Sequence, residues 1–242
     1  KSDPETDDVK RTELELWEKI KAKSLGGRRT GLGITAEGDM LAALGLRYGS
    51  EKAIDFAVEV QQNLAVEAYR SSVNMAAERG AFPIYDTKRE ENNPMIDRIR
   101  TADPALYEQM AKVGRRNISL LTIAPTGTTS LMTQTTSGIE PVFLPFYIRR
   151  RKVNPNDKNA VITFRDDVGD CWEEYYVFHH KFLTWCDVNG IPAEEVKKMS
   201  VKDVETLVEK SPYHRATSAD IDWVAKVKMQ GAIQKWVDHS IS

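Results

Sequence analysis

The residues best suited to chemistry in this sequence form a run of small, hydroxyl-bearing side chains at residues 124–130, Ala-Pro-Thr-Gly-Thr-Thr-Ser. The run follows a short apolar segment that meets Pro125, and a helix can begin at about Thr128. The first turn of a helix leaves backbone N–H groups without intrahelical partners, and the helix dipole places partial positive charge there. Small side chains let an anion approach those amides, and hydroxyl groups add donors. The residue types therefore indicate a phosphate-binding turn that uses no lysine.

A second interpretation of this run stays open. Thr126 can simply cap a helix that binds nothing, because capped helix starts are common. The run is not a P-loop, since no Gly-Lys-Ser/Thr sequence follows it. The glycines at 31 and 33 are too few for a dinucleotide-binding fingerprint, and no βαβ pattern surrounds them.

Helical periodicity predicts that helices make up most of the elements that position the run. Ser50 and Asp103 are suited to cap two of them. We expect helices at 9–24, 36–45, 50–79, 94–100, 103–113 and 218–238, with a helical second half of 172–186 and a capped turn at 200–209. We expect extended segments at 117–124, 141–153 and 160–165, and loops at 81–93 and 153–159.

The overall composition limits the classes of protein to which the chain can belong. The 242 residues are 41% apolar and 29% charged, which suits a large folded core. The formal net charge is −2, so the chain lacks the excess of basic residues that nucleic-acid-binding proteins carry, and we expect no nucleic-acid partner. No apolar run approaches the ~20 residues that span a bilayer, so we expect no membrane partner. The acidic first residues are not a secretory signal, and two cysteines without metal spacing favour a reducing, cytoplasmic setting.

Residues 124–130, followed by Ser-Gly-Ile-Glu-Pro-Val-Phe at 137–143, closely resemble the large catalytic subunit of ribonucleotide reductases. The similarity is greatest to the adenosylcobalamin-dependent branch (class II). Residues 28–33, 44–50 and 147–151 support the resemblance, which runs from about residue 11 to the C-terminus. It implies that the substrate's phosphates contact the helix start. The implied contacts are Thr126, Gly127, Thr128, Thr129 and Ser130.

The resemblance also implies a fold and a reaction. The fold class would be α/β, mostly helical here, as a partial segment of the family's ten-stranded α/β barrel. Residues 1–242 would be the C-terminal part of the catalytic barrel domain, truncated at both ends. The whole enzyme would reduce ribonucleotides to deoxyribonucleotides by thiyl-radical chemistry, with adenosylcobalamin as cofactor. Its partners would be a ribonucleotide substrate, a dithiol reductant such as thioredoxin, and a second copy in a homodimer.

The catalytic cysteine motifs of that family, Asn-x-Cys-x-Glu and a Cys-Asn-Leu-type segment, do not occur in this sequence. Cys171 and Cys186 stand in other contexts, and we interpret them as ordinary core or surface thiols. We therefore expect no catalytic residue in these 242 residues, and no activity from them alone.

Three further candidates can be interpreted structurally, two of them in preference to a functional role. The basic run 149–152 follows an extended segment and is better read as a solvated strand edge than as a phosphate patch. Glu140 is equally suited to a structural or a functional role. The adjacent His179 and His180 would point in different directions, and no further ligand completes a metal site, so we expect no metal.

Two rival functions remain at this stage. The chain can be a helical scaffold or assembly module without a ligand site, docking through 50–79 and 218–238. It can also be the equivalent segment of a class I reductase, which uses a separate radical-generating subunit. A pocket lined by backbone N–H groups at a helix start near Thr128 favours substrate binding, and a helix start buried under side chains favours the scaffold.

Overall fold

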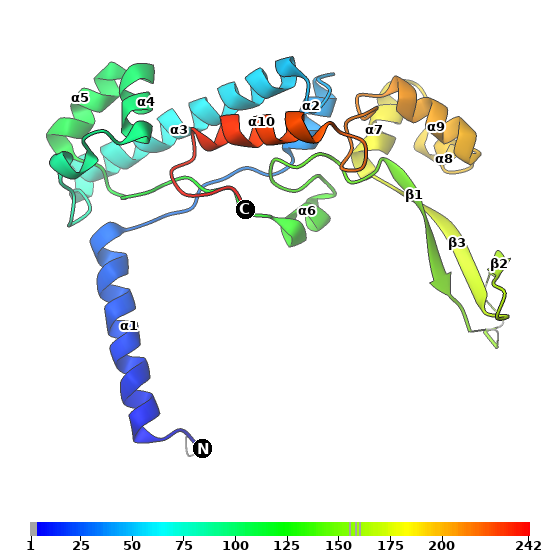
Figure 1. The fold of residues 1–242 in the computed structure, drawn as a ribbon, viewed down its shortest axis with the longest axis horizontal. Coiled ribbons are helices and arrows are strands. Elements are labelled where there is room, and N and C mark those ends of the chain that lie inside the picture. The colour runs from blue at the N-terminus through cyan, green and yellow to red at the C-terminus, as the bar shows by residue number, and fades with distance from the viewer. Residues whose placement is uncertain (1–3, 155, 158, 160) are drawn as a thin grey trace. The chain divides into compact units, whose positions relative to one another are not determined.

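The computed structural model describes residues 4–154, 156–157, 159 and 161–242 (Figure 1). The chain forms two compact units, each assembled from separate stretches of sequence. Unit 1 comprises residues up to 33 together with 56–124 and 230–242, and unit 2 comprises 34–55 and 125–229. The elements in chain order are α1 (Asp7–Gly27), α2 (Glu37–Ala43), α3 (Glu51–Arg79), the 3-10 helix η1 (Thr87–Glu90), α4 (Pro94–Ala102), α5 (Pro104–Val113), α6 (Gly127–Thr133), β1 (Phe146–Lys152), β2 (Phe164–Arg165), β3 (Cys171–Phe178), α7 (His180–Val188), α8 (Ala193–Val196), α9 (Val201–Lys210) and α10 (Trp223–Gln234).

About half of the chain is helical and the sheet is small, as the predicted mostly helical α/β class requires. Local capping chemistry sets several helix ends. The Ser50 hydroxyl accepts a hydrogen bond from the Ala53 N–H at 3.3 Å, and the Asp103 carboxylate accepts one from the Leu106 N–H at 2.9 Å. Gly80, with φ of 78°, ends α3 in the left-handed region. The predicted starts of α3 and α5 are therefore confirmed.

Unit 1 is organised around a buried arginine. Arg115 is 2% exposed, and its guanidinium donates two hydrogen bonds to the Glu90 carboxylate, at 2.6 and 2.5 Å. The guanidinium carbon lies 5.5, 5.4 and 5.9 Å from the ring centroids of Tyr69, Phe82 and Tyr85. A bidentate carboxylate and aromatic faces are the partners that a buried guanidinium requires.

The prediction of a continuous strand at 117–124 was wrong. The segment is extended and largely buried, but it forms isolated parallel bridges, Leu32 with Leu121 and Ile123 with Ile241, rather than a continuous strand. The ladder stays short because a side chain replaces part of it. The Asp238 carboxylate accepts the N–H groups of Leu120 and Leu121. The parallel sense of these bridges is the sense expected of barrel strands.

A glycine permits the close approach of two of these segments. A Cβ atom added at Gly33 would lie 2.1 Å from the Thr122 carbonyl oxygen, so no larger residue fits there without a backbone shift. Gly33 therefore serves close backbone packing in unit 1, and Gly31 leaves room for the Thr122 side chain, which would lie 2.8 Å from an added Cβ atom.

Unit 2 contains the antiparallel sheet, in the order β1-β3-β2, with Phe146 paired to Phe178 and Lys152 paired to Trp172. The predicted extended segments at 141–153 and 160–165 appear as β1 and β2; residue 160 and loop residues 155 and 158 lie outside the described residues. Helices α7, α8 and α9 supply the core beside the sheet. Its buried members are Ala42, Val142, Phe182, Cys186, Val196, Val204 and Tyr213.

The helix predicted at 218–238 is shorter at both ends, because α10 spans Trp223–Gln234. The Ser218 N–H donates to the Val142 carbonyl at 2.8 Å, so Ser218 extends a parallel bridge instead of capping a helix. At the other end the Gln234 side-chain amide donates to the Val237 and His239 carbonyls, at 3.1 Å each. Those side-chain hydrogen bonds replace the next helical turn.

Helix α1 leaves its apolar side chains exposed: Leu14 is 60% and Trp17 64% exposed, and among its described residues only Gly27 is buried. No helix in the described part of the chain combines the length and the apolar character needed to cross a bilayer.

Candidate functional site

The small-residue run forms a left-handed turn followed by a short helix in unit 2. Thr126 has φ of 53° and ψ of 27°, and α6 begins at the next residue, Gly127. Gly127, Thr128 and Thr129 are exposed, and the described part of the chain offers their backbone N–H groups no hydrogen-bond partner. A Cβ atom added at Gly127 would meet nothing within 4 Å. The start of α6 is therefore open, with three free backbone donors.

The hydroxyl groups of the run divide into two kinds. Thr126 Oγ1 accepts the Gly138 N–H at 2.9 Å and lies 2.9 Å from Thr35 Oγ1. The Ser130 hydroxyl is buried and donates to the Gly127 carbonyl at 2.8 Å, with Ser137 Oγ 2.7 Å away. These two hydroxyls hold the turn together, and the Ser130 N–H donates to the Thr126 carbonyl at 2.8 Å. Neither hydroxyl is therefore available for the predicted contact with phosphate.

Thr128 and Thr129 carry the remaining hydroxyls. Both side chains are exposed, and within the described residues neither hydroxyl has a hydrogen-bond partner. Together with the three open amides they are the donors that an anion can reach. The geometry therefore narrows the five residues predicted from the sequence to a surface made by Gly127, Thr128 and Thr129.

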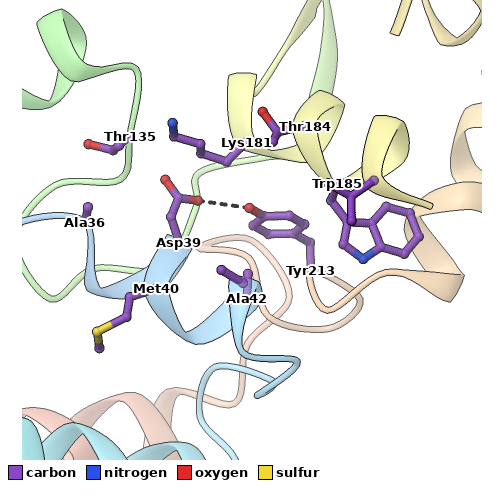
Figure 2. A pocket seen from close by; sticks show the side chains of 11 residues that line it. Ala36, Asp39, Met40, Ala42, Thr135, Lys181, Thr184, Trp185 and Tyr213 are labelled. Atoms are coloured by element: carbon purple, nitrogen blue, oxygen red, sulfur yellow. Dashed lines mark hydrogen bonds between the residues drawn. The ribbon is translucent and has the colours of Figure 1, made fainter. Parts of the chain in front are cut away.

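A buried carboxylate that was not among the candidates from the sequence, that of Asp39, binds the segment that follows α6. Asp39 of α2 is 7% exposed, and its Oδ2 accepts the Thr136 N–H at 2.8 Å. Its Oδ1 lies 2.7 Å from His179 Nε2. The same oxygen accepts the Tyr213 hydroxyl at 3.0 Å (Figure 2). Burial and the Asp39 charge raise the pKa of Tyr213, so this phenol stays a donor. The helix predicted at 36–45 contains two acidic residues, Glu37 and Asp39, among apolar and small ones, and this was the available sequence signal for Asp39.

The start of α2 is closed by the same segment that follows α6. The Ala36 N–H donates to the Thr136 carbonyl at 3.1 Å and the Glu37 N–H to the Gly138 carbonyl at 3.2 Å. The Asp39 N–H donates to Thr136 Oγ1 at 3.3 Å. The Glu37 and Asp39 amides in the first turn of α2 thus have protein partners, whereas within the described residues the Gly127, Thr128 and Thr129 amides of α6 have none.

Glu37 is a second buried carboxyl group, and it lacks a partner. It is 1% exposed, and neither of its carboxyl oxygens has a hydrogen-bond partner among the described residues. Burial raises its pKa from 4.5 to about 8, so the neutral acid is the main form at pH 7. Its neighbour Tyr48 donates to the Ile139 carbonyl, and burial raises the pKa of that phenol as well.

A cavity of about 400 Å³ lies behind the turn, in unit 2. Ser130, Ser137 and the exposed Glu140 contribute polar groups to it, and Phe143, Tyr147 and Phe178 contribute aromatic surface. The three open amides of α6 do not line it. Glu140 therefore faces a cavity, which leaves both its structural and its functional interpretation open.

The other sequence candidates take structural roles. Arg150 pairs with Glu174 at 2.6 Å and Arg151 with Glu173 at 2.5 Å, across β1 and β3, so the basic run is a solvated strand edge, as predicted. His179 binds Asp39, and His180 begins α7.

Both cysteines are buried in unit 2. Neither forms a disulfide, and burial raises the pKa of Cys186 to about 11, so its thiol stays protonated near neutral pH. This burial agrees with the interpretation of Cys186 as a core thiol.

Comparison with known proteins adds to this geometry. A family model described as "Ribonucleotide reductase, barrel domain" matches residues 7–242. The vitamin B12-dependent ribonucleoside-diphosphate reductase of Mycobacterium tuberculosis (strain CDC 1551 / Oshkosh) is 35% identical over 123 residues, which are 50% of this chain and 15% of that protein. The enzyme of the same name from Thermoplasma acidophilum is 31% identical over 133 residues, 54% of this chain and 15% of that protein. The ribonucleoside-diphosphate reductase subunit alpha of Chlamydia pneumoniae is 29% identical over 148 residues, 53% of this chain and 14% of that protein. The chain therefore matches only about one seventh of the length of these relatives.

We predict that Asp39→Asn destabilises the chain by about 2–4 kcal/mol, because an amide offers one acceptor where the carboxylate offers two, and its NH₂ group would face another donor. Urea unfolding monitored by circular dichroism measures the change. Asp55→Asn, at an exposed position of α3, is the matched control and should shift the midpoint little. Equal midpoints for the two variants would contradict the role given to Asp39.

We predict that Glu37 makes stability fall as pH rises. Its pKa in the folded chain, about 8, lies above its ordinary value of 4.5, so the folded state binds the extra proton between these values. The contribution of Glu37 to the free energy of unfolding is fully present below about pH 4.5 and is lost towards pH 8, at no more than roughly 1.4 kcal/mol per pH unit. Glu37→Gln removes this dependence, and Glu51→Gln, at an exposed position, does not. Urea unfolding at pH 5, 6.5 and 8 checks it; the same pH slope for wild type and Glu37→Gln would refute it.

Proposed function

Because the chain belongs to the ribonucleotide reductase barrel-domain family, we propose that it is part of an enzyme that reduces ribonucleotides to deoxyribonucleotides. Its own contribution is to hold the substrate by its phosphates at the start of α6. The observation that carries this role is the open helix start, where Gly127, Thr128 and Thr129 present three amides and two hydroxyls that have no hydrogen-bond partner among the described residues. Thr126 and Ser130 shape the turn from within.

The proposed role is positioning rather than bond making. Anchoring the phosphates converts the meeting of ribose and reactive groups into an event within one complex, which lowers the entropic part of the barrier. The thiyl-radical chemistry itself is assigned to residues of the whole enzyme outside 1–242. The burial of Cys186 and its raised pKa support this division, because a protonated core thiol is poorly suited to redox exchange.

The open start of α6 also bears on the scaffold alternative. The backbone of residues 127–129 is exposed and not buried under side chains, which is against the scaffold criterion, although its amides do not line the cavity behind the turn. We therefore favour substrate binding over a scaffold without a ligand site.

We further propose that the whole enzyme uses adenosylcobalamin, which supplies the initiating radical when bound, with a dithiol protein such as thioredoxin as reductant, and that it works as a homodimer. The vitamin B12-dependent relatives support the cofactor. The two cavities of about 400 and 460 Å³ in unit 2 have the volume of drug-sized ligands, which are smaller than a corrin with its adenosyl group. These residues do not fit the cofactor, so we assign no step through it to this chain.

Thr128→Glu tests the phosphate site. A carboxylate at this exposed first-turn position repels phosphate, yet it suits the helix dipole, so α6 should stay folded. We expect the Kd of the full-length protein for a nucleoside diphosphate to rise tenfold or more, whereas Thr128→Gln, which has the same shape without the charge, changes it by less than about threefold. Isothermal titration calorimetry measures both. An unchanged Kd for Thr128→Glu would remove the phosphate site from α6.

The cofactor has its own test. We expect the full-length protein, purified alone with a dithiol reductant, to form deoxyribonucleotide only when adenosylcobalamin is added. Product is quantified by chromatography, with hydroxocobalamin as the matched control. Turnover that requires a second, radical-generating subunit and no cobalamin would place the protein in class I, while leaving the phosphate site at α6 unaffected.

A further inference from the structure

A second cavity in unit 2, of about 460 Å³, lies between facing surfaces of two helices (Figure 2). Ala36 and residues of α2 spaced three and four apart line one wall: Asp39, Met40 and Ala43. Residues of α7 with the same spacing line the other wall: Lys181, Thr184, Trp185 and Val188. This spacing places each set on one face of its helix. Ala42, Thr135 and Tyr213 complete the lining, which is mostly apolar, and the volume falls in the range of small-molecule sites.

The two charged groups that line this cavity differ in how many hydrogen-bond partners they have. Asp39 already receives the Thr136 amide, the Tyr213 hydroxyl and the His179 ring. Lys181 is half-buried at the cavity, and among the described residues its ammonium group has no ion pair or hydrogen bond. A cation beside apolar surface gains most from an anionic partner that brings its own apolar body.

The aromatic side chains that line this cavity are held in place by ring packing. The Trp185 ring stacks on Phe182 with centroids 6.1 Å apart and planes 11° apart, and Phe182 is fully buried. The Tyr213 ring packs edge-on against Phe182 and is held by Asp39. A rigid aromatic wall binds a flat molecule without paying to order side chains.

We propose that this cavity binds a small organic anion with a flat apolar body, whose charged group pairs with Lys181 and whose body lies against Trp185. The site is separate from the open amides of α6, which do not line it. The proposal does not depend on the phosphate site, so either can fail without the other.

The probe is 2-naphthoate, with the uncharged 2-naphthylmethanol for comparison, titrated calorimetrically into the full-length protein. We expect naphthoate to bind and Lys181→Gln to weaken it about tenfold, as the loss of one charged hydrogen bond predicts. The alcohol should bind weakly and equally to wild type and Lys181→Gln. Ala43→Phe, at an exposed position on the cavity wall, should fill the space and abolish binding. Lys202→Gln, at an exposed position of α9, is the matched control and should bind as wild type does.

Circular dichroism and urea unfolding verify that each variant is folded. Absence of naphthoate binding in the full-length protein overturns the proposal, as does binding that neither Lys181→Gln nor Ala43→Phe alters. Equal weakening of naphthoate and the alcohol by Lys181→Gln would show that this residue acts by packing, and would overturn the charge pairing. Loss in both test variants with retention in Lys202→Gln supports the site.

Discussion

The hydrogen bonds of one buried carboxylate, that of Asp39, organise the functional part of unit 2. A carboxylate taken out of water is costly unless donors surround it, and Asp39 receives the Thr136 amide, the Tyr213 hydroxyl and the His179 ring. These donors come from three separate stretches of chain. Satisfying one charge therefore joins α2, the segment after α6, and the residues that flank the aromatic core.

The same constraint explains why two neighbouring helix starts behave differently. The amides at the start of α2 are taken by Thr136 and Gly138, which fixes the register of the two segments. The segment after α6 is therefore held firmly, and Thr126 is tied to it through the Gly138 N–H. The amides that begin α6 are left with no protein partner among the described residues and form an open anion-binding surface. Rigid support on one side and free donors on the other are what a substrate-positioning turn needs.

Much of the fold followed from local patterns. Ser50 and Asp103 cap the predicted helices because a side-chain oxygen reaches an amide three residues ahead, which is information contained in a few adjacent residues. The errors arose where distant residues intervened. Asp238 takes amides that a strand at 117–124 would have given to a neighbour. Ser218 pairs with Val142 instead of starting a helix.

The sequence by itself determined the small-residue turn, the helix that follows it and the family to compare it with, because these depend on contiguous residue types. Only the tertiary structure decided which donors are free. The hydroxyls of Thr126 and Ser130 hydrogen-bond within the turn, and those of Thr128 and Thr129 have no partner in the part of the chain that the structure describes. It also decided that Asp39 meets His179 and Tyr213, which lie 140 and 174 residues further along the chain. Burial and long-range hydrogen bonding depend on which surfaces meet in space, and no periodicity within a helix or strand encodes that meeting.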